Sequence, residues 1–393
     1  MNIGRHNGNN GNRGNTYRSN HHGRGSGSGR GGGRGGHGGN TGKKVCYFHI
    51  VGKCNKGTDC TFSHDISLMA CEHAHSAPIK GLVVLADGTF YTGSADKLLS
   101  QWSWNSASNS LSKNGSSTLA GEIKHIEVVE NFIIWSMDVS SDQFPGETVG
   151  QVHAMNITDS KTFELQLSEK RPYTHPMSVL QFIVRMMDGD LHFITGGLEG
   201  NIHIWTLSAA TGIVSHVTAL EGHIRGVTCM VLQGSMLWSG SMDNSICVWN
   251  MATVQMVGSV TSATDGHIEA VTCMTLVNTP TDGEFVVSGS VDCSVKVWLP
   301  NGKLHYSTDE GTVVTALASA EDGYGGIVVL VGLSDGKIII RSWKCLDDLI
   351  VLDQHVRHRG EVWCIKSCFP GVVATGGADG KVIVWTAQQS LFP

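Results

Sequence analysis

The amino-acid sequence predicts an all-β chain whose main part is a ring of seven similar sheets, a β-propeller. A turn motif containing Gly followed three residues later by an acid recurs along residues 66–390, and a Trp usually follows the acid by six positions. Short apolar runs such as Val227–Leu232 separate these turns, with strand patterning and no helical periodicity. A period near 40–50 residues with such turns is typical of propeller blades.

Uneven charge indicates that a separate segment precedes this ring. The chain has 393 residues, with 28 Lys and Arg and 34 Asp and Glu, for a net charge of -6. Residues 1–44 contain eight of the basic residues and no acid, so their charge of +8 leaves -14 on the remaining residues. The sequence therefore predicts a basic arm joined to an acidic body.

The arm, residues 1–44, contains sixteen of the 50 Gly residues and eight Asn, and almost nothing apolar. Such a segment buries too little surface to offset its chain entropy, so we expect it to be disordered. Arg24, Arg30 and Arg34 are each followed by Gly and resemble the RGG boxes of RNA-binding proteins. Guanidinium groups pair with phosphates and stack on bases, which favours nucleic-acid binding over a purely solubilising linker.

The compartment is predicted from two absences in the sequence. No apolar region follows the N-terminus, and no run approaches the roughly 18 apolar residues of a membrane helix. The eleven Cys residues are therefore expected to be reduced thiols in the nucleus or cytoplasm, in a protein that is not secreted.

A metal-binding pattern occupies residues 45–65. Cys46, Cys54, Cys60 and His64 follow the spacing Cys-x7-Cys-x5-Cys-x3-His. Three thiolates and one imidazole complete the tetrahedral shell of a structural Zn²⁺ and leave no position open for a reactive water. Because this short segment has little hydrophobic core of its own, metal binding must supply its folding free energy. The sequence predicts one structural zinc ion here.

This segment resembles the CCCH zinc fingers, which typically bind single-stranded RNA by stacking bases on aromatic rings. The resemblance implies that Phe62 and one of Tyr47 or Phe48 stack on bases, while Lys53 and Lys56 supply positive charge. Phe48 and Phe62 can instead form the small core of the finger. Some CCCH fingers bind DNA or protein, and a single finger lacks the affinity of a tandem pair.

The repeats differ in how completely they keep the motif. Four match without gaps: Thr92–Asp96 with Trp102, Ser239–Asp243 with Trp249, Ser288–Asp292 with Trp298, and Thr375–Asp379 with Trp385. A fifth has Glu199 in place of Asp, and a sixth has Arg341 in place of Trp. A degenerate second blade, with strands near 132–136 and 152–156 and a polar insertion at 138–150, brings the predicted number of blades to seven.

These segments resemble the WD-repeat family, in which a His, a Ser or Thr, an Asp and a Trp form a hydrogen-bonded structural tetrad. The resemblance assigns four tetrads: His75–Thr92–Asp96–Trp102, His223–Ser239–Asp243–Trp249, His267–Ser288–Asp292–Trp298 and His358–Thr375–Asp379–Trp385. The Glu repeat has His175 in the corresponding place. We expect residues 66–71 to pair into the last blade and close the ring, which removes open sheet edges.

A Ser-His-Asp set also suggests a hydrolase, but a hydrolase needs one such set in a cleft with an oxyanion site. Four equivalent copies indicate a structural network, so no enzymatic activity is expected. By the family resemblance, the residue before each turn acid lies on the narrower face, where several apolar side chains can contribute to protein docking. These residues are Ala95, Leu198, Met242, Val291, Ser334 and Ala378.

A CCCH finger ahead of seven such repeats resembles the plant zinc-finger and WD-repeat proteins. The sequence predicts a non-enzymatic adaptor, whose arm and finger bind nucleic acid, above all single-stranded RNA, and whose propeller docks protein partners. The sequence predicts that the protein does not bind a membrane and has no small-molecule substrate. The alternatives are a protein-interaction scaffold, such as a ubiquitin-ligase substrate receptor, and a DNA-binding zinc-finger protein.

Overall fold

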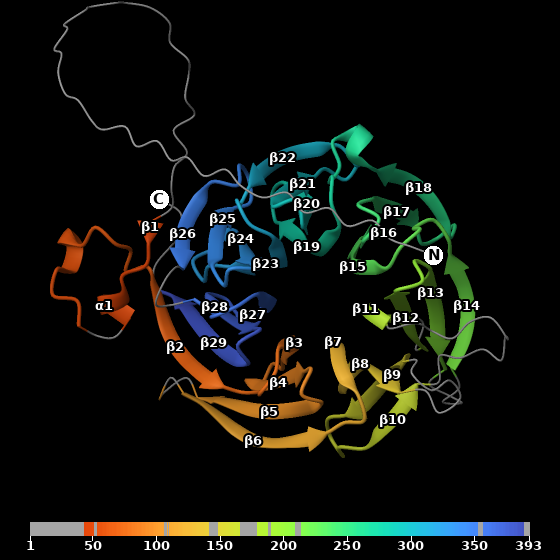
Figure 1. Ribbon diagram of the computed structural model, residues 1–393, viewed down its shortest axis with the longest axis horizontal. Helices are drawn as coiled ribbons and strands as arrows, with labels where there is room; N and C mark the ends of the chain where they lie inside the picture. Colours follow the sequence, from red (N-terminus) through yellow and green to blue (C-terminus); the bar gives the residue numbers. More distant parts are fainter. Residues whose placement is uncertain are drawn as a thin grey trace, which may run out of the picture. The chain divides into compact units, whose positions relative to one another are not determined.

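The computed structural model describes residues 43–50, 53–105, 108, 110–140, 148–165, 179–187, 190–208, 214–352 and 357–388. Their strands form seven sheets that follow one another around a ring, which confirms the predicted all-β, seven-bladed propeller (Figure 1). Most of the arm, with Arg24, Arg30 and Arg34, lies outside the described residues, and so does His175.

Each blade has four antiparallel strands, numbered outward from the centre in blades 1 to 6. Blades 1 to 3 contain β3 (Ile79–Val84), β4 (Thr89–Ser94), β5 (Leu98–Asn105) and β6 (Ser110–Thr118), then β7 (Glu122–Val129), β8 (Phe132–Ser140), β9 (Thr148–Asn156) and β10 (Thr162–Leu165), then β11 (Val179–Met187), β12 (Asp190–Gly197), β13 (Ile202–Leu207) and β14 (Val214–Leu220). Blades 4 and 5 contain β15 (Val227–Gln233), β16 (Met236–Ser241), β17 (Ile246–Asn250) and β18 (Gln255–Val260), then β19 (Val271–Thr279), β20 (Gly283–Ser290), β21 (Ser294–Trp298) and β22 (Leu304–Asp309).

The last two blades also hold the N-terminal strands. Blade 6 contains β23 (Val314–Glu321), β24 (Ile327–Leu333), β25 (Ile338–Ser342) and β26 (Asp348–Leu352), with β1 (Lys43–Lys44) added at its outer edge. Blade 7 contains β27 (Val362–Phe369), β28 (Val372–Gly377) and β29 (Lys381–Ala387), with β2 (Ile66–His73) as its outer strand. The described helical segments are short: α1 (Tyr47–Ile50) and the 3-10 turns Gly57–Asp59 and Ser262–Thr264.

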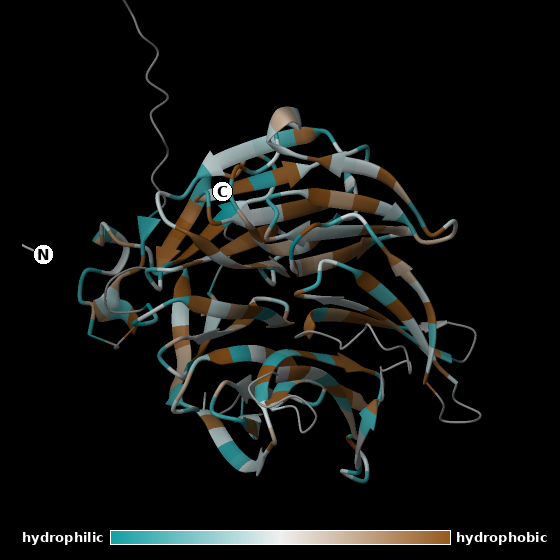
Figure 2. Cartoon of the chain, turned by 45° about the vertical axis from the view of Figure 1, so that its right-hand side comes forward, coloured by the Kyte–Doolittle hydropathy of each residue, from teal (hydrophilic) through white to brown (hydrophobic). Residues whose placement is uncertain are grey.

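The first strand of each blade lies at the centre of the ring, since neighbouring blades contact one another through these strands all the way from β3 to β27 and back to β3. Hydrophobic residues are frequent along the strands, and hydrophilic residues are frequent in the turns between them (Figure 2). The core is divided among clusters that each draw on adjacent blades, as where Ile202 of blade 3 packs with Trp249 of blade 4. Burial of this apolar surface between sheets holds the blades together.

Threonine hydroxyls add hydrogen bonds between four consecutive blades. Thr228, Thr272 and Thr315 each follow the first residue of an inner strand, and each hydroxyl donates to the backbone carbonyl of the first residue in the next inner strand, at 2.5, 2.6 and 2.6 Å. Trp363 and Lys80 occupy the same position in blades 7 and 1, where the Lys80 ammonium lies 2.9 Å from the centre of the Trp363 ring. The contacts between neighbouring inner strands therefore differ between blades 4 to 7 and the junction of blades 7 and 1.

The ring closes through strands from opposite parts of the sequence. Strand β2 pairs antiparallel with β29, so three C-terminal strands and one N-terminal strand complete blade 7. Such closure leaves no open sheet edge between the first and last blades.

Lys43 and Lys44, which the sequence places in the arm, form a strand instead. They pair in parallel with Ile350 and Val351 of β26, and the Val45 amide continues the pairing by donating to the Val351 carbonyl at 3.3 Å. Unpaired backbone groups at the edge of blade 6 give these two lysines partners that composition alone does not reveal.

The second blade corrects a strand prediction. Strands β8 and β9 extend to Ser140 and from Thr148, where they are paired, although residues 138–150 are predicted as a polar insertion. Val139 and Val149 face each other across this extension, and β-branched pairs favour the pleated ladder. Among the residues that the structure describes, no helix is long and apolar enough to cross a membrane.

Candidate metal centre and structural tetrads

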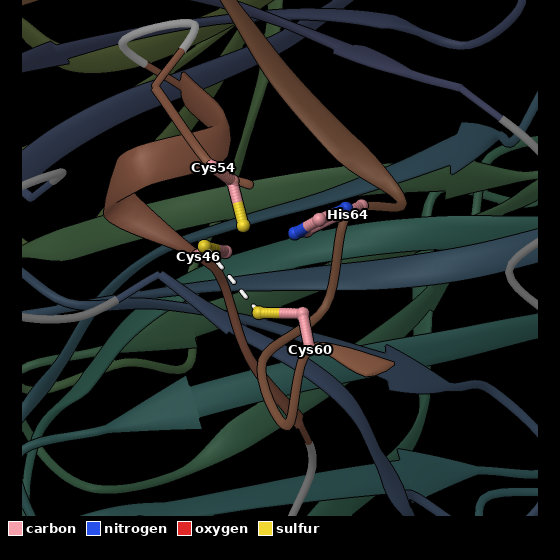
Figure 3. A group of neighbouring side chains, drawn as sticks. All are labelled: Cys46, Cys54, Cys60 and His64. Carbon is pink, nitrogen blue, oxygen red and sulfur yellow. Dashed lines mark hydrogen bonds between the residues drawn. The ribbon is translucent and has the colours of Figure 1, made fainter. Parts of the chain in front are cut away.

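The four residues predicted as metal ligands come together between β1 and β2. Cys46 immediately precedes α1, Cys60 follows the 3-10 turn Gly57–Asp59, and His64 lies two residues before β2. Their side chains point toward one another, with that of Cys54 completing the group (Figure 3). The ligand atoms all lie within 4.8 Å of one another.

Two observations test whether these side chains fit a tetrahedral ion. The Cys46 and Cys60 sulfurs are 3.7 Å apart, close to the roughly 3.8 Å separation of two thiolates on a tetrahedral Zn²⁺ with bonds of about 2.3 Å. His64 Nε2 is buried and has no hydrogen-bond partner among the described residues. A buried imidazole nitrogen that faces three sulfurs matches the donor set of a structural zinc site.

The thiols of the cluster lie in unlike environments. Burial raises the pKa of Cys46, whereas the backbone amide of Lys56 lowers the pKa of Cys54 by donating a hydrogen bond to its sulfur. His49 stacks on His64, with ring centres 4.2 Å apart, while its Nε2 lies 3.4 Å from the Ser67 hydroxyl. His49 thus supports the ligand ring and lies outside the four-residue cluster.

The aromatic residues of the finger are on its surface. Phe48 is 60% exposed, Phe62 is 49% exposed and Tyr47 is 43% exposed. Phe48 and Phe62 therefore do not form a buried core for the finger; Val45 and Ile50 pack instead against the hydrophobic cluster of blades 6 and 7. Exposed rings of this kind offer faces on which bases can stack.

Lys53 and Lys56 are also exposed in the finger. Both lie in the segment that carries Cys54, so they add positive charge beside the ligand cluster. If the cluster held Zn²⁺, three thiolates and a neutral imidazole would give the centre a net charge of about -1, which these two lysines would more than offset.

The four tetrads predicted from the family resemblance are hydrogen-bonded in the structure. In blade 1 the Trp102 indole donates to the Thr92 hydroxyl at 3.0 Å, which lies 2.8 Å from His75 Nε2, and His75 Nδ1 lies 3.0 Å from Asp96. The same contacts join His223, Ser239, Asp243 and Trp249; His267, Ser288, Asp292 and Trp298; and His358, Thr375, Asp379 and Trp385.

These contacts change the acidity of the tetrad residues. Burial alone would raise the pKa of Asp379, yet hydrogen bonds from His358 and the Arg359 amide lower it to about 2. Burial opposes the charging of His223, but its hydrogen bonds to Asp243 and Cys247 raise its pKa to about 9. These shifts favour a charged Asp and a charged His, whose hydrogen bonds stabilise the fold.

The Ser and Thr hydroxyls of the tetrads are inaccessible. Thr92, Ser239, Ser288 and Thr375 are all fully buried, and each already accepts a hydrogen bond from its Trp indole. A nucleophile must reach its substrate, so this geometry suits packing and not attack on a substrate.

Blades 2 and 3 replace parts of the tetrad. In blade 3 the Trp205 indole donates to Thr195 at 2.9 Å, and Glu199 lies 3.5 Å from His203. In blade 2 the strand register puts Trp135 where blade 1 has Thr92, and this buried indole ring stacks on His153. Aromatic stacking there takes the place of hydrogen bonds.

Blade 6 contains an ion pair that the sequence analysis missed. Arg341, which stands in the Trp position, donates to Glu310 at 2.6 Å and also pairs with Asp348 at 2.5 Å. Glu310 precedes Val314 by four residues, the same interval that separates each tetrad His from its strand. That interval could have identified Glu310 as the partner of the unexpected Arg.

The fold is a seven-bladed propeller with a tetrad in four of its blades, and a Cys3His cluster precedes it in the sequence. The family model described as "WD domain, G-beta repeat" matches residues 214–250, 258–298 and 348–386, so the chain contains WD repeats.

Two of the curated relatives are named for a CCCH zinc finger. The chain is 26% identical to Zinc finger CCCH domain-containing proteins 59 and 62 of Arabidopsis thaliana, over 50% of its length in each case and over 38% and 44% of theirs. It is 30% identical to Protein ROOT INITIATION DEFECTIVE 3 of Arabidopsis thaliana, over 55% of the chain and 50% of that protein. The matches span half or less of these relatives. The resemblance to plant CCCH and WD-repeat proteins is confirmed.

A solved structure supports the fold. The chain resembles the computationally designed Ika8 protein with a TM-score of 0.56 and 20% identity, over 80% of this chain and 97% of that one. At this identity the likeness concerns the propeller fold.

Proposed function

We propose that this protein is a non-enzymatic adaptor that binds single-stranded RNA through its finger and docks protein partners on its propeller. One Zn²⁺ bound by Cys46, Cys54, Cys60 and His64 holds the finger in shape. The arm, which precedes the finger in the sequence, adds positive charge, and the protein acts in the nucleus or cytoplasm. The buried Ser or Thr residue of every complete tetrad supports the absence of catalysis.

The observation that carries the RNA proposal is the exposure of three aromatic rings around the Cys3His cluster. Phe48, Phe62 and Tyr47 are each at least 43% exposed, although large aromatic side chains are usually well buried. Lys53 and Lys56 are exposed in the same segment. Rings that stack bases, beside amines that contact phosphates, form a typical surface for single-stranded nucleic acid.

The uneven charge favours nucleic-acid binding by the arm and finger and protein binding by the propeller. The body carries a net charge of -14 against +8 on the arm, which disfavours wide contact between the propeller and a phosphate backbone. Nucleic acid should therefore contact the finger and the arm, and the propeller faces remain available to protein partners.

The test titrates the full-length protein into labelled single-stranded RNA, single-stranded DNA and duplex RNA at two salt concentrations, with fluorescence anisotropy as the readout. Stacking contributes about 1–3 kcal/mol per base, so Phe62→Ala should weaken RNA binding roughly 5- to 150-fold. Tyr306→Ala is the matched control, because it removes a ring that is 42% exposed on β22 of the propeller.

Each outcome separates the alternatives. Equal affinities for Phe62→Ala and Tyr306→Ala would refute base stacking on the finger. Preference for single-stranded DNA would favour the DNA-binding alternative. Absence of binding to any nucleic acid at low salt would leave a protein-interaction scaffold, such as a ubiquitin-ligase substrate receptor.

The zinc proposal has its own measurement. Atomic emission of the purified protein should give one Zn²⁺ per chain, and Cys60→Ser should reduce it. Because Val45 and Ile66 on either side of the cluster pack in the core of blades 6 and 7, removal of the metal should also lower the melting temperature of the propeller. Full zinc content in Cys60→Ser would contradict the assignment.

A further inference from the structure

Large apolar side chains are exposed together on one face of blades 3 to 5. Ile224 is 86% exposed and Ile268 is 68% exposed, while Leu198 and Val291 are each about two-fifths exposed. Met242, in the turn after β16, is partly buried beside them. We refer to these five residues as the apolar patch.

The backbone of the patch is held in place by the tetrads. Ile224 and Ile268 each follow a tetrad His, and their amides donate to Asp243 at 2.9 Å and to Asp292 at 3.0 Å. Because the Asp residue fixes the amide while the His side chain is buried, the Ile side chain is directed into solvent. Little conformational entropy of the backbone remains to be lost on binding.

Contacts join the turns and loops that carry the patch from blade 3 to blade 5. Gly226 lies between Leu198 and Met242, and a Cβ atom there would lie 3.2 Å from Leu198 and 3.3 Å from the Met242 sulfur. The Met242 amide donates to the Gly226 carbonyl at 2.9 Å, which brings the turn of blade 4 against its entry loop. The Asn244 side chain then donates to the Ile268 carbonyl and connects blade 4 with blade 5.

The fold does not require these apolar residues. The positions that match Ile224 and Ile268 are Ser76 in blade 1 and Arg359 in blade 7, and their amides make the same hydrogen bond to the tetrad Asp. In the turns, the positions that match Met242 and Val291 hold Ala95 and Ala378. Polar or small residues therefore serve the structure equally well, and the apolar patch is a property of blades 3 to 5.

Acidic side chains accompany the patch. Glu221 and Glu269 are exposed and lie within three residues of Ile224 and Ile268, with Arg225 as a basic neighbour. The acidic excess of the body also favours a positively charged ligand. Its ligand should therefore combine apolar anchors with positive charge.

We propose that the apolar patch binds a segment of a partner protein that presents large apolar side chains flanked by Lys or Arg. This inference rests on the proposed docking function of the propeller and specifies its site and ligand chemistry. The Ile side chains supply apolar contact area at the centre, and the carboxylates at the rim select for positive charge.

The test uses the full-length protein and a fluorescein-labelled peptide, Lys-Arg-Leu-Phe-Arg-Lys, with two comparison peptides. One replaces every basic residue by Glu, and the other replaces Leu-Phe by Ser-Ser. The basic apolar peptide should bind, and Ile224→Ser with Ile268→Ser should weaken it at least tenfold. Val217→Ser is the matched control, since Val217 is 56% exposed on β14.

Three results would overturn the inference: equal binding of the acidic peptide, equal binding to the double variant, or self-association of the protein that the double variant abolishes. The double variant should keep the melting temperature and RNA affinity of the parent, because both side chains are largely exposed. Crosslinks between the propeller and cellular proteins outside the patch would refute this site while preserving the docking function.

Discussion

Blades 5 and 6 lie next to each other and have the same four-strand order, yet different chemistry holds their turns. In blade 5 a chain of hydrogen bonds runs from Trp298 through Ser288 to His267 and Asp292. In blade 6 an ion pair between Glu310 and Arg341 occupies the positions of His267 and Trp298. The comparison shows that the fold accepts more than one kind of buried polar network at this point.

The largest effect should come from breaking the ion pair of blade 6. Arg341→Met leaves the fully buried Glu310 carboxylate without its guanidinium, and removal of one partner of a buried pair costs about 3–5 kcal/mol. Urea unfolding at pH 7 checks this value. Lys344→Met is the control, because the exposed pair of Lys344 with Asp282 should contribute less than about 1 kcal/mol.

The same comparison allows a rescue. Glu310→His, Val331→Ser and Arg341→Trp together place the residue types of blade 5 at the equivalent positions of blade 6, where Asp335 is already present. The triple variant should be more stable than Arg341→Met. A triple variant that is no more stable would show that the two networks are not interchangeable.

A smaller loss is expected in blade 5. Ser288→Ala removes the hydroxyl that accepts from the Trp298 indole and contacts His267 Nε2, so buried polar groups lose their partner, at about 1–3 kcal/mol. Chemical denaturation measures the change. Ser100→Ala offers a matched control, since the Ser100 hydroxyl is equally buried but has no hydrogen-bond partner among the described residues.

The smallest effect should be a pH dependence of the same network. Although burial opposes ionisation, hydrogen bonds from His267 and Ser294 lower the pKa of Asp292 well below its ordinary value of about 4. Stability from this carboxylate is thus present above that ordinary value and is lost as the pH falls toward the lower pKa of the folded state.

Asp292→Asn should therefore destabilise the protein at pH 6, and its difference from the parent should shrink as the pH falls toward about 3. Urea midpoints measured across this range test the sign of the effect. A difference that stays constant with pH would contradict a charged Asp292. Asp159→Asn, at an exposed ion pair, should give little change at any pH in this range.

Local spacing explains which features the sequence could predict. Two short patterns fix ligand type or strand position. One is the spacing of Cys46, Cys54, Cys60 and His64, and the other is the interval from Asp to Trp in each complete blade. The cluster geometry and the tetrad hydrogen bonds correspond to these patterns. Strand β2 likewise follows from a last blade that lacks an outer strand.

Features that depend on pairing between distant segments could not be predicted in this way. The contact of Val45 with the core of blades 6 and 7 and the pairing of Lys43 with Ile350 depend on where the ring places its outer edges. The structure of blade 2 differs from the sequence prediction for a related reason. The pairing of Val139 with Val149 extends a hairpin into a segment that is predicted as a polar insertion.

The pairing of β1 with β26 and of β2 with β29 also sets an order of events during synthesis. The finger is translated before the propeller, but the strands of blades 6 and 7 that contact it are translated only after the other blades. Until then, β2 and the Val45 side chain are unpartnered on the nascent chain. Ring closure and finger docking are consequently late, coupled steps, and a truncated product would expose an unpaired strand to chaperones and proteases.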